Sequence, residues 1–286
     1  MANKSFRVRY YVGVVMDPPG VKVSDLFARL IQGGFPYPHL QDGSVAYEMR
    51  DLVGLNGDRV FKGVLAVLRD DAPNIREAGG GERPITLADD EHVIEKNHFL
   101  YYSDRQLLAW QVNGRGSHIS RMEKYLSYVS GMTVGLADVI QPNALRRLNE
   151  GTVKRLKVRI ASSKNAAAVD PHDWESGTLD LMNGIGATSI TVEVSAGKRA
   201  GQLKDEVKGV LHRLLEREDT RAVQVTMTGE QEPIDLFADC ITDKITVPML
   251  GLYPIAEDIF AQLEESKKRN QAAFDEYFGQ GNNILE

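Results

Sequence analysis

Lysine and arginine side chains are concentrated in residues 146–164, where the sequence reads RRLNEGTVKRLKVRIASSK. This segment has seven cationic residues and one glutamate, so its formal charge is +6, whereas the whole chain carries −6. Guanidinium and ammonium groups gathered in this way can neutralise the phosphates of a nucleic acid. The alternative is a solvated strand surface, on which lysine also discourages aggregation at a sheet edge. Both interpretations are open at the level of the sequence.

Side chains alternate between the two faces of an extended strand, so the segment VKRLKVRI places its apolar and its charged residues on opposite faces. Arg155, Lys157 and Arg159 share one face, about 6–7 Å apart, and repel one another unless anions or solvent attend them. No pattern of base-reading side chains accompanies them, so we expect phosphate contacts with weak sequence preference. The candidate DNA-binding residues are Arg146, Arg147, Lys154, Arg155, Lys157, Arg159, Lys164, Lys198 and Arg199.

Acidic side chains and a histidine adjoin one another at Asp89, Asp90, Glu91 and His92. Such groups can hold a divalent ion that activates water, so a metal-dependent nuclease is one alternative. The segment DPHDWE, residues 170–175, could also hold an ion, although a solvated loop explains both segments more simply. We find no zinc-ligand spacing, phosphate-binding glycine loop or other catalytic motif, and therefore expect a non-enzymatic protein without a cofactor or metal.

The overall composition, with 42% hydrophobic and 26% charged residues, is typical of a globular protein. Its acidic balance excludes the class of strongly basic proteins that bind nucleic acid over their whole surface, so binding must depend on a local patch. The single Cys240 cannot form an internal disulfide bond, and we see neither a signal peptide nor an apolar run long enough to span a bilayer. These features predict a cytoplasmic protein that does not insert into membranes directly.

Hydrophobic periodicity and turn residues predict the elements of the first half of the chain. Residues 6–16 alternate as a strand, and residues 22–34 have the pattern of a short helix with Ser24 as its N-cap. An Asn56–Gly57 turn joins two strands, and a second helix ends at Gly131.

From Thr152 onward, three predicted strands alternate with two predicted helices, in the order β-α-β-α-β. We therefore predict an α+β fold with a larger mixed α/β globular domain and an inserted smaller β-α-β-α-β domain. The larger domain would comprise residues 1–149 and 232–286, ending in a long helix from Pro254, and the inserted basic domain would comprise residues 150–231.

Four phrases of the sequence, in this order along the chain, carry a resemblance to a known family. They are YYVGVVMDPPGVKVSDLFARLI, LADDEHVIEKNHFLYYSDRQLLAWQV, LKVRIASS with MNGIGATSITVEVSAG, and YPIAEDIFAQLEESKKRNQAAFDEYF. The chain resembles the RexA-like phage-exclusion proteins of lambdoid prophages, although its acidic balance departs from that family.

The resemblance implies a cytoplasmic antiviral defence protein that binds DNA without strong sequence specificity. It further implies a homodimer that signals to a RexB-like membrane-protein partner, with DNA contacts from the cations of residues 146–164 and from Lys198 and Arg199. A protein-interaction module that recognises an acidic partner is the alternative from a different class.

Overall fold

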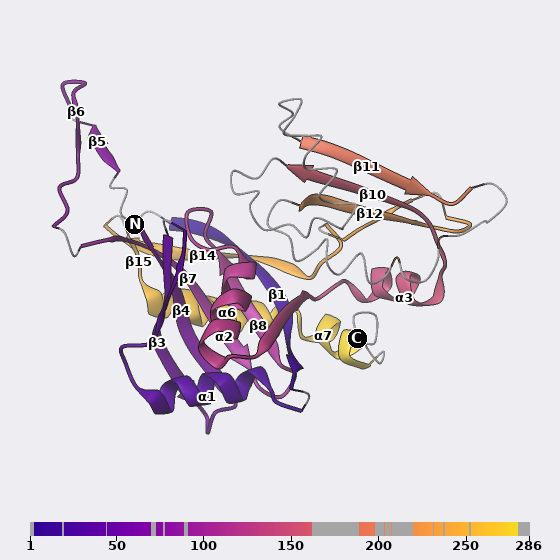
Figure 1. The fold of residues 1–286 in the computed structure, drawn as a ribbon, viewed down its shortest axis with the longest axis horizontal. Coiled ribbons are helices and arrows are strands. Elements are labelled where there is room, and N and C mark those ends of the chain that lie inside the picture. Colours follow the sequence, from indigo (N-terminus) through magenta and orange to yellow (C-terminus); the bar gives the residue numbers. More distant parts are fainter. Residues whose placement is uncertain are drawn as a thin grey trace. The chain divides into compact units, whose positions relative to one another are not determined.

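The computed structural model describes residues 3–18, 20–43, 45–69, 73–76, 78–88, 91–161, 189–197, 203, 207, 220–230, 232–236, 238–251 and 253–279. Helices and a larger number of antiparallel strands combine in these residues, which confirms the predicted α+β class. The chain divides into two compact units (Figure 1). Unit 1 comprises Met1–Asp138 and Thr242–Gln271, and unit 2 comprises Val139–Ile241 and Ala272–Glu286. In the described part of the chain, no helix has the length and apolar character needed to cross a membrane.

Unit 1 is built on an antiparallel sheet with the strand order β15-β14-β1-β8-β7-β4-β3-β2, in which β9 also pairs with β1. Its strands are β1 (Asn3–Asp17), β2 (His39–Asp42), β3 (Val45–Leu55), β4 (Val60–Arg69), β7 (Val93–Tyr102), β8 (Leu107–Val112), β9 (Thr133–Asp138), β14 (Thr242–Leu250) and β15 (Tyr253–Pro254). A separate hairpin consists of β5 (Asn74–Arg76) and β6 (Glu82–Pro84). The sheet thus joins the first strand of the chain to a strand from its last fifth.

Helices cover both faces of this sheet. Phe27 of α1 (Val23–Gly33) packs on Phe61 and Tyr101, with ring centroids 5.6 and 5.1 Å apart, in a core to which α2 (Ile119–Ser130) also contributes. Tyr11 of β1 lies in that core, whereas the hydroxyl of its neighbour Tyr10 hydrogen-bonds to α6 (Ala256–Arg269). Because adjacent strand residues point to opposite faces, α6 covers the face opposite α1 and α2.

Unit 2 contains a smaller antiparallel sheet with the order β11-β10-β12-β13. Its elements are β10 (Val153–Ala161), β11 (Ser189–Ser195), β12 (Thr220–Met227), β13 (Ile234–Asp235), and the helices α3 (Pro142–Glu150) and α7 (Gln271–Gly279). The three longer strands lie where the sequence predicts them. The helix predicted at 175–186 falls outside the described residues, and so does the one predicted at 201–218 except for Leu203 and Val207.

Unit 2 begins before the predicted boundary at residue 150, and its first segment ends after the predicted boundary at residue 231. The Gln141 amide donates to the Asp239 carbonyl, and the Ile241 amide donates to the Val139 carbonyl, each at 2.7 Å. Residues 139–141 and 239–241 are therefore paired as two adjacent segments before α3 begins. This pairing extends unit 2 to residues 139–241, and the chain from Ala272 onward also belongs to it.

Three local expectations are corrected by backbone geometry. Helix α1 is capped at Lys22, whose amide donates to the Asp25 carboxylate at 3.0 Å, and Ser24 is buried inside the helix. The turn at Asn56 is longer than a two-residue turn, because the left-handed φ angles continue through Gly57 to Asp58. The predicted long C-terminal helix is two helices, α6 and α7, separated at Asn270.

Asn270 interrupts that helix because its side-chain amide donates to the Ser266 carbonyl at 2.9 Å, in competition with the regular backbone pattern. By contrast, α2 ends as predicted. Gly131 adopts a left-handed φ of 67° there, and its amide donates to the Ser127 carbonyl.

Gly63 provides a test of the packing between β4 and β7. A Cβ atom at this position would lie 2.7 Å from Cζ of Phe99 and 3.2 Å from Cδ1 of Leu52, both in the core. We expect Gly63→Ala to lower the free energy of unfolding by about 1–3 kcal/mol, because the core is overpacked. Gly114→Ala is the control, since a Cβ there meets nothing within 4 Å. Equal urea-unfolding midpoints for the two variants would contradict this packing.

A buried ion pair connects β1 to β9. Nη2 of Arg9 donates to Oδ1 of Asp138 at 2.8 Å, and the Asp138 side chain is only 8% exposed. Burial raises the pKa of Asp138 from its ordinary value of 3.8 to about 6, and Arg9 opposes this shift only in part. The folded protein therefore binds a proton at Asp138 more readily than the unfolded chain does.

This shift predicts that Asp138 makes the protein less stable as the pH rises from about 4 to about 6. The free energy of unfolding of the native protein, minus that of Asp138→Asn, should fall by an amount on the order of 2 kcal/mol across this interval. Urea unfolding at a series of pH values measures the difference. If it increases with pH instead, attraction to Arg9 outweighs burial, and the pKa of Asp138 is not raised.

Candidate functional site

Strand β10 positions the predicted cations as the sequence pattern indicates. Leu156, Val158 and Ile160 are buried, whereas the four cationic residues that alternate with or precede them are exposed. Those residues are Lys154, Arg155, Lys157 and Arg159. Arg155, Lys157 and Arg159 share the solvent-facing side of the small sheet with the residues opposite them on β11 and β12. We call this surface the small-sheet face.

Strand β10 does not lie at the edge of its sheet, because it pairs with β11 on one side and with β12 on the other. Its cations therefore do not protect an exposed backbone from edge-to-edge aggregation, which was one part of the structural alternative. A ligand on this face meets side chains and not free backbone groups. The remaining structural explanation is a plain solvated surface.

Carboxylates compensate only part of the positive charge on the small-sheet face. Nε of Arg155 lies 3.2 Å from Oε1 of Glu193, and both side chains are about half exposed, at 49% and 45%. Asp235 accepts a hydrogen bond from Gln224 at 3.1 Å. Among the described residues, no carboxylate forms an ion pair with Lys157 or Arg159, although Glu193 lies opposite Lys157 in the register. Two exposed cations thus stay available to an external anion.

Arg146 and Arg147, which the sequence groups with these cations, are engaged within unit 2. Arg147 donates from Nε to Oε2 of Glu230 at 2.8 Å and from Nη2 to the Glu232 carbonyl at 2.8 Å. Hydrogen bonding to Glu230 raises the pKa of Arg147 above its ordinary value. Nη2 of Arg146 lies 2.6 Å from Oε1 of Glu276 on α7. Both arginines therefore hold α3 to other parts of unit 2, and a DNA contact would have to compete with these ion pairs.

The other predicted binding residues, Lys164, Lys198 and Arg199, lie outside the described residues. So do Asp89, Asp90 and the whole of residues 170–175. Of the three acidic residues at positions 89–91, the structure describes Glu91, whose carboxylate accepts a hydrogen bond from the Ala88 amide at 2.9 Å. No cluster of three potential metal ligands occurs in the described part of the chain.

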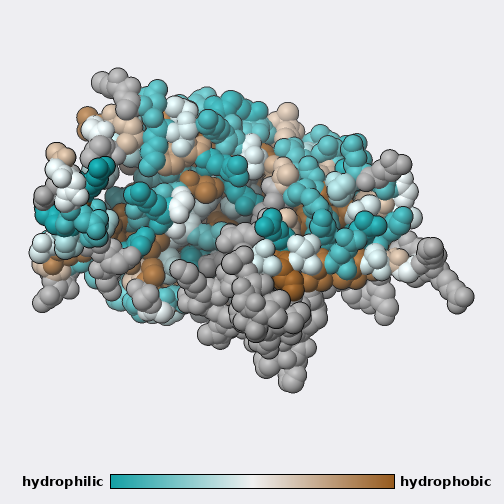
Figure 2. Space-filling model, turned by 90° about the horizontal axis from the view of Figure 1, so that it is seen from above, coloured by the Kyte–Doolittle hydropathy of each residue, from teal (hydrophilic) through white to brown (hydrophobic). Residues whose placement is uncertain are grey.

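The visible surface is mainly polar. Hydrophilic residues predominate among the coloured atoms of Figure 2, and hydrophobic residues form small groups and short rows. Such a surface favours recognition by charge over burial of a large apolar area. Sequence reasoning identified the cations of the small-sheet face but missed Glu193 as a partner of Arg155, because the register that brings them together cannot be read from either strand alone.

Comparison with known proteins gives a family but no activity. Residues 55–272, more than half of the chain, match the model of DUF6731, a family of unknown function. No curated protein matches this chain.

The two neighbouring arginines of α3 allow a test of their structural role. Arg147→Gln should lower the free energy of unfolding by about 1–2 kcal/mol, since it removes charge-assisted hydrogen bonds to Glu230 and a bond to a carbonyl. Arg146→Gln should change it by less than about 0.5 kcal/mol, because an exposed ion pair contributes little. Urea unfolding at neutral pH measures both. The assignment fails if Arg147→Gln leaves stability unchanged.

Proposed function

The chain belongs to the DUF6731 family, and we propose that it binds the sugar-phosphate backbone of DNA through the small-sheet face, without strong sequence preference. The observation that supports this most directly is the state of Lys157 and Arg159. Both are exposed on one face of a central strand, in a row with Arg155, and neither is in an ion pair with a described carboxylate. Double-stranded DNA carries one charge per about 1.7 Å of axis, so such a row meets phosphates whatever the base sequence.

In this proposal the binding is weak and its dependence on salt is shallow, and the same face explains both. Arg155 is partly neutralised by Glu193, and the chain as a whole is acidic. Few counterions are therefore released per protein bound, and the repulsion between the remaining surface and DNA opposes association. Binding is strongest where the duplex approaches the small-sheet face and avoids the acidic surface.

The biological role in this proposal rests on the resemblance to RexA-like proteins. In that role the protein is a cytoplasmic homodimer that binds DNA and signals to a RexB-like membrane-protein partner, and the result is phage exclusion. A second candidate is an interaction module for an acidic protein. Lys157 and Arg159 support it as well, because exposed cations can pair with the carboxylates of a protein partner as they can with phosphates.

The test is a titration of a short duplex against the purified protein at several salt concentrations. Replacing all three cations, as Arg155→Gln, Lys157→Gln and Arg159→Gln together, should weaken binding and reduce the dependence of log K on log salt. The slope should fall by about 0.9 for each phosphate that the variant no longer neutralises. Two duplexes of unrelated sequence should give the same affinity within about threefold, because the protein binds phosphates and not base edges.

Glu193→Gln is the matched variant of opposite sign. It removes a negative charge from the same face and releases Arg155, so it should strengthen DNA binding and steepen the salt dependence. Lys268→Gln, on α6 of unit 1, removes an exposed cation elsewhere and should leave the isotherm unchanged. An unchanged isotherm for the triple variant removes the small-sheet face from the mechanism. Retention of a protein partner after nuclease treatment, without binding to either duplex, favours the interaction module.

A further inference from the structure

A second uncompensated pair of cations lies in unit 1, on the exposed part of the sheet formed by β1 and β14. Arg7 and Lys244 are directly opposite each other in the antiparallel register, so their side chains leave the same face of the sheet. Both are exposed. On its other side, Arg7 lies opposite the apolar Val112 of β8. Like charges placed directly opposite each other destabilise a sheet unless an anion or solvent screens them.

A carboxylate of the chain neutralises the neighbouring cation, Arg9, but none neutralises Arg7 or Lys244 among the described residues. Arg9, two residues further along the same face of β1, is paired with Asp138 at 2.8 Å. Asp243, next to Lys244 in sequence, is turned to the opposite face, where it binds Arg269 of α6 at 2.6 Å. In the described ranges of the chain, neither Arg7 nor Lys244 forms an ion pair.

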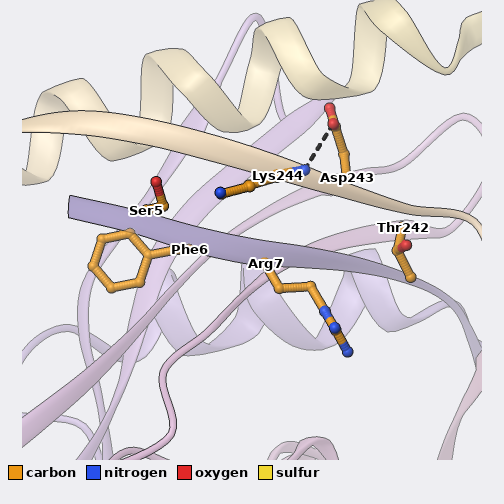
Figure 3. Close-up of a pocket in the computed structure, with 6 residues that line it drawn as sticks. All are labelled: Ser5, Phe6, Arg7, Thr242, Asp243 and Lys244. Carbon is orange, nitrogen blue, oxygen red and sulfur yellow. Dashed lines mark hydrogen bonds between the residues drawn. The ribbon is translucent and has the colours of Figure 1, made fainter. Parts of the chain in front are cut away.

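Hydroxyl groups border the cations on the same face. Ser5 lies opposite Thr246, with their side-chain oxygens 2.9 Å apart, and Thr242 lies opposite Arg9. Figure 3 shows Asp243 pointing toward the helix above the strands, whereas Arg7 extends to the other side. An open depression of about 510 Å³ is lined by Ser5, Phe6, Arg7, Thr242, Asp243 and Lys244. Its volume falls in the range of small-molecule sites.

From this geometry we infer that the depression over Arg7 and Lys244 binds the phosphate or pyrophosphate group of a small phosphorylated molecule. The guanidinium group of Arg7 offers a planar pair of donors that matches two oxygens of such a group, and the Lys244 ammonium adds a second positive charge. The hydroxyls of Ser5 and Thr242 can donate to further oxygens. A bound dianion also removes the repulsion between the two cations. This inference concerns unit 1 and does not rest on DNA binding by the small-sheet face.

Inorganic pyrophosphate is the probe, added to the full-length chain without divalent metal and at ionic strength held constant with sodium chloride. The midpoint of thermal unfolding should rise with pyrophosphate and then saturate, as expected for a ligand of the native state. Arg7→Gln and Lys244→Gln should each weaken the affinity roughly tenfold, and the double variant should abolish the rise. In chloride alone, either single substitution should leave the midpoint equal or higher, because it removes a repulsion.

Lys4→Gln is the matched control, because Lys4 lies over the Phe6 ring at 5.0 Å, on the opposite face of the same strand, and its loss should not affect pyrophosphate binding. The triple variant of the small-sheet face should also retain it. The inference is overturned if the native protein shows no saturable rise, if the Arg7 and Lys244 double variant retains it, or if Lys4→Gln also loses it. A response to duplex DNA that requires Arg7 and Lys244, without any response to pyrophosphate, overturns the assignment to a small molecule.

Discussion

The alternation of side chains along β1 is the constraint on which unit 1 depends. This strand pairs with β14, β8 and β9, so it joins the beginning of the chain to a strand close to its end. Tyr10 and Tyr11 project to opposite faces, one toward α6 and the other into the core beneath α1 and α2. A shift of register by one residue would exchange the two faces and place each aromatic set against the wrong helices, so the register is strongly determined. The position of Arg7 follows from the same constraint.

Charge compensation then decides which exposed cations can serve a ligand. Where an arginine is wholly or partly buried, as with Arg9, a carboxylate of the chain neutralises it, because an unpaired buried charge is costly. At the surface this requirement disappears, and Arg7, Lys157 and Arg159 lie without such a partner among the described residues. A buried ion pair therefore marks a cation that the fold needs, whereas an exposed cation without such a pair can be left to an external anion.

Local patterns in the sequence predict what depends on neighbouring residues, and non-local pairing explains the rest. The alternation of β10 and the end of α2 at Gly131 follow from spacing and residue type, as does the α+β class. The ion pair of Arg147 with Glu230 and the central position of β10 depend on segments that meet only in the folded chain. For the same reason, the cationic pair of Arg7 and Lys244 has no signature in the sequence.

The acidic balance of the chain is compatible with local anion binding because the two act over different distances. At about 0.1 M salt the screening length is about 10 Å, which is comparable to the length of the row from Arg155 to Arg159. An anion in contact with that row is attracted by the nearest cations, whereas carboxylates beyond the screening length act on it only weakly. At lower salt, the net charge of −6 acts over a longer range and slows the approach of a polyanion. Net charge therefore governs how fast an anion arrives, and the arrangement of the uncompensated cations governs where it stays.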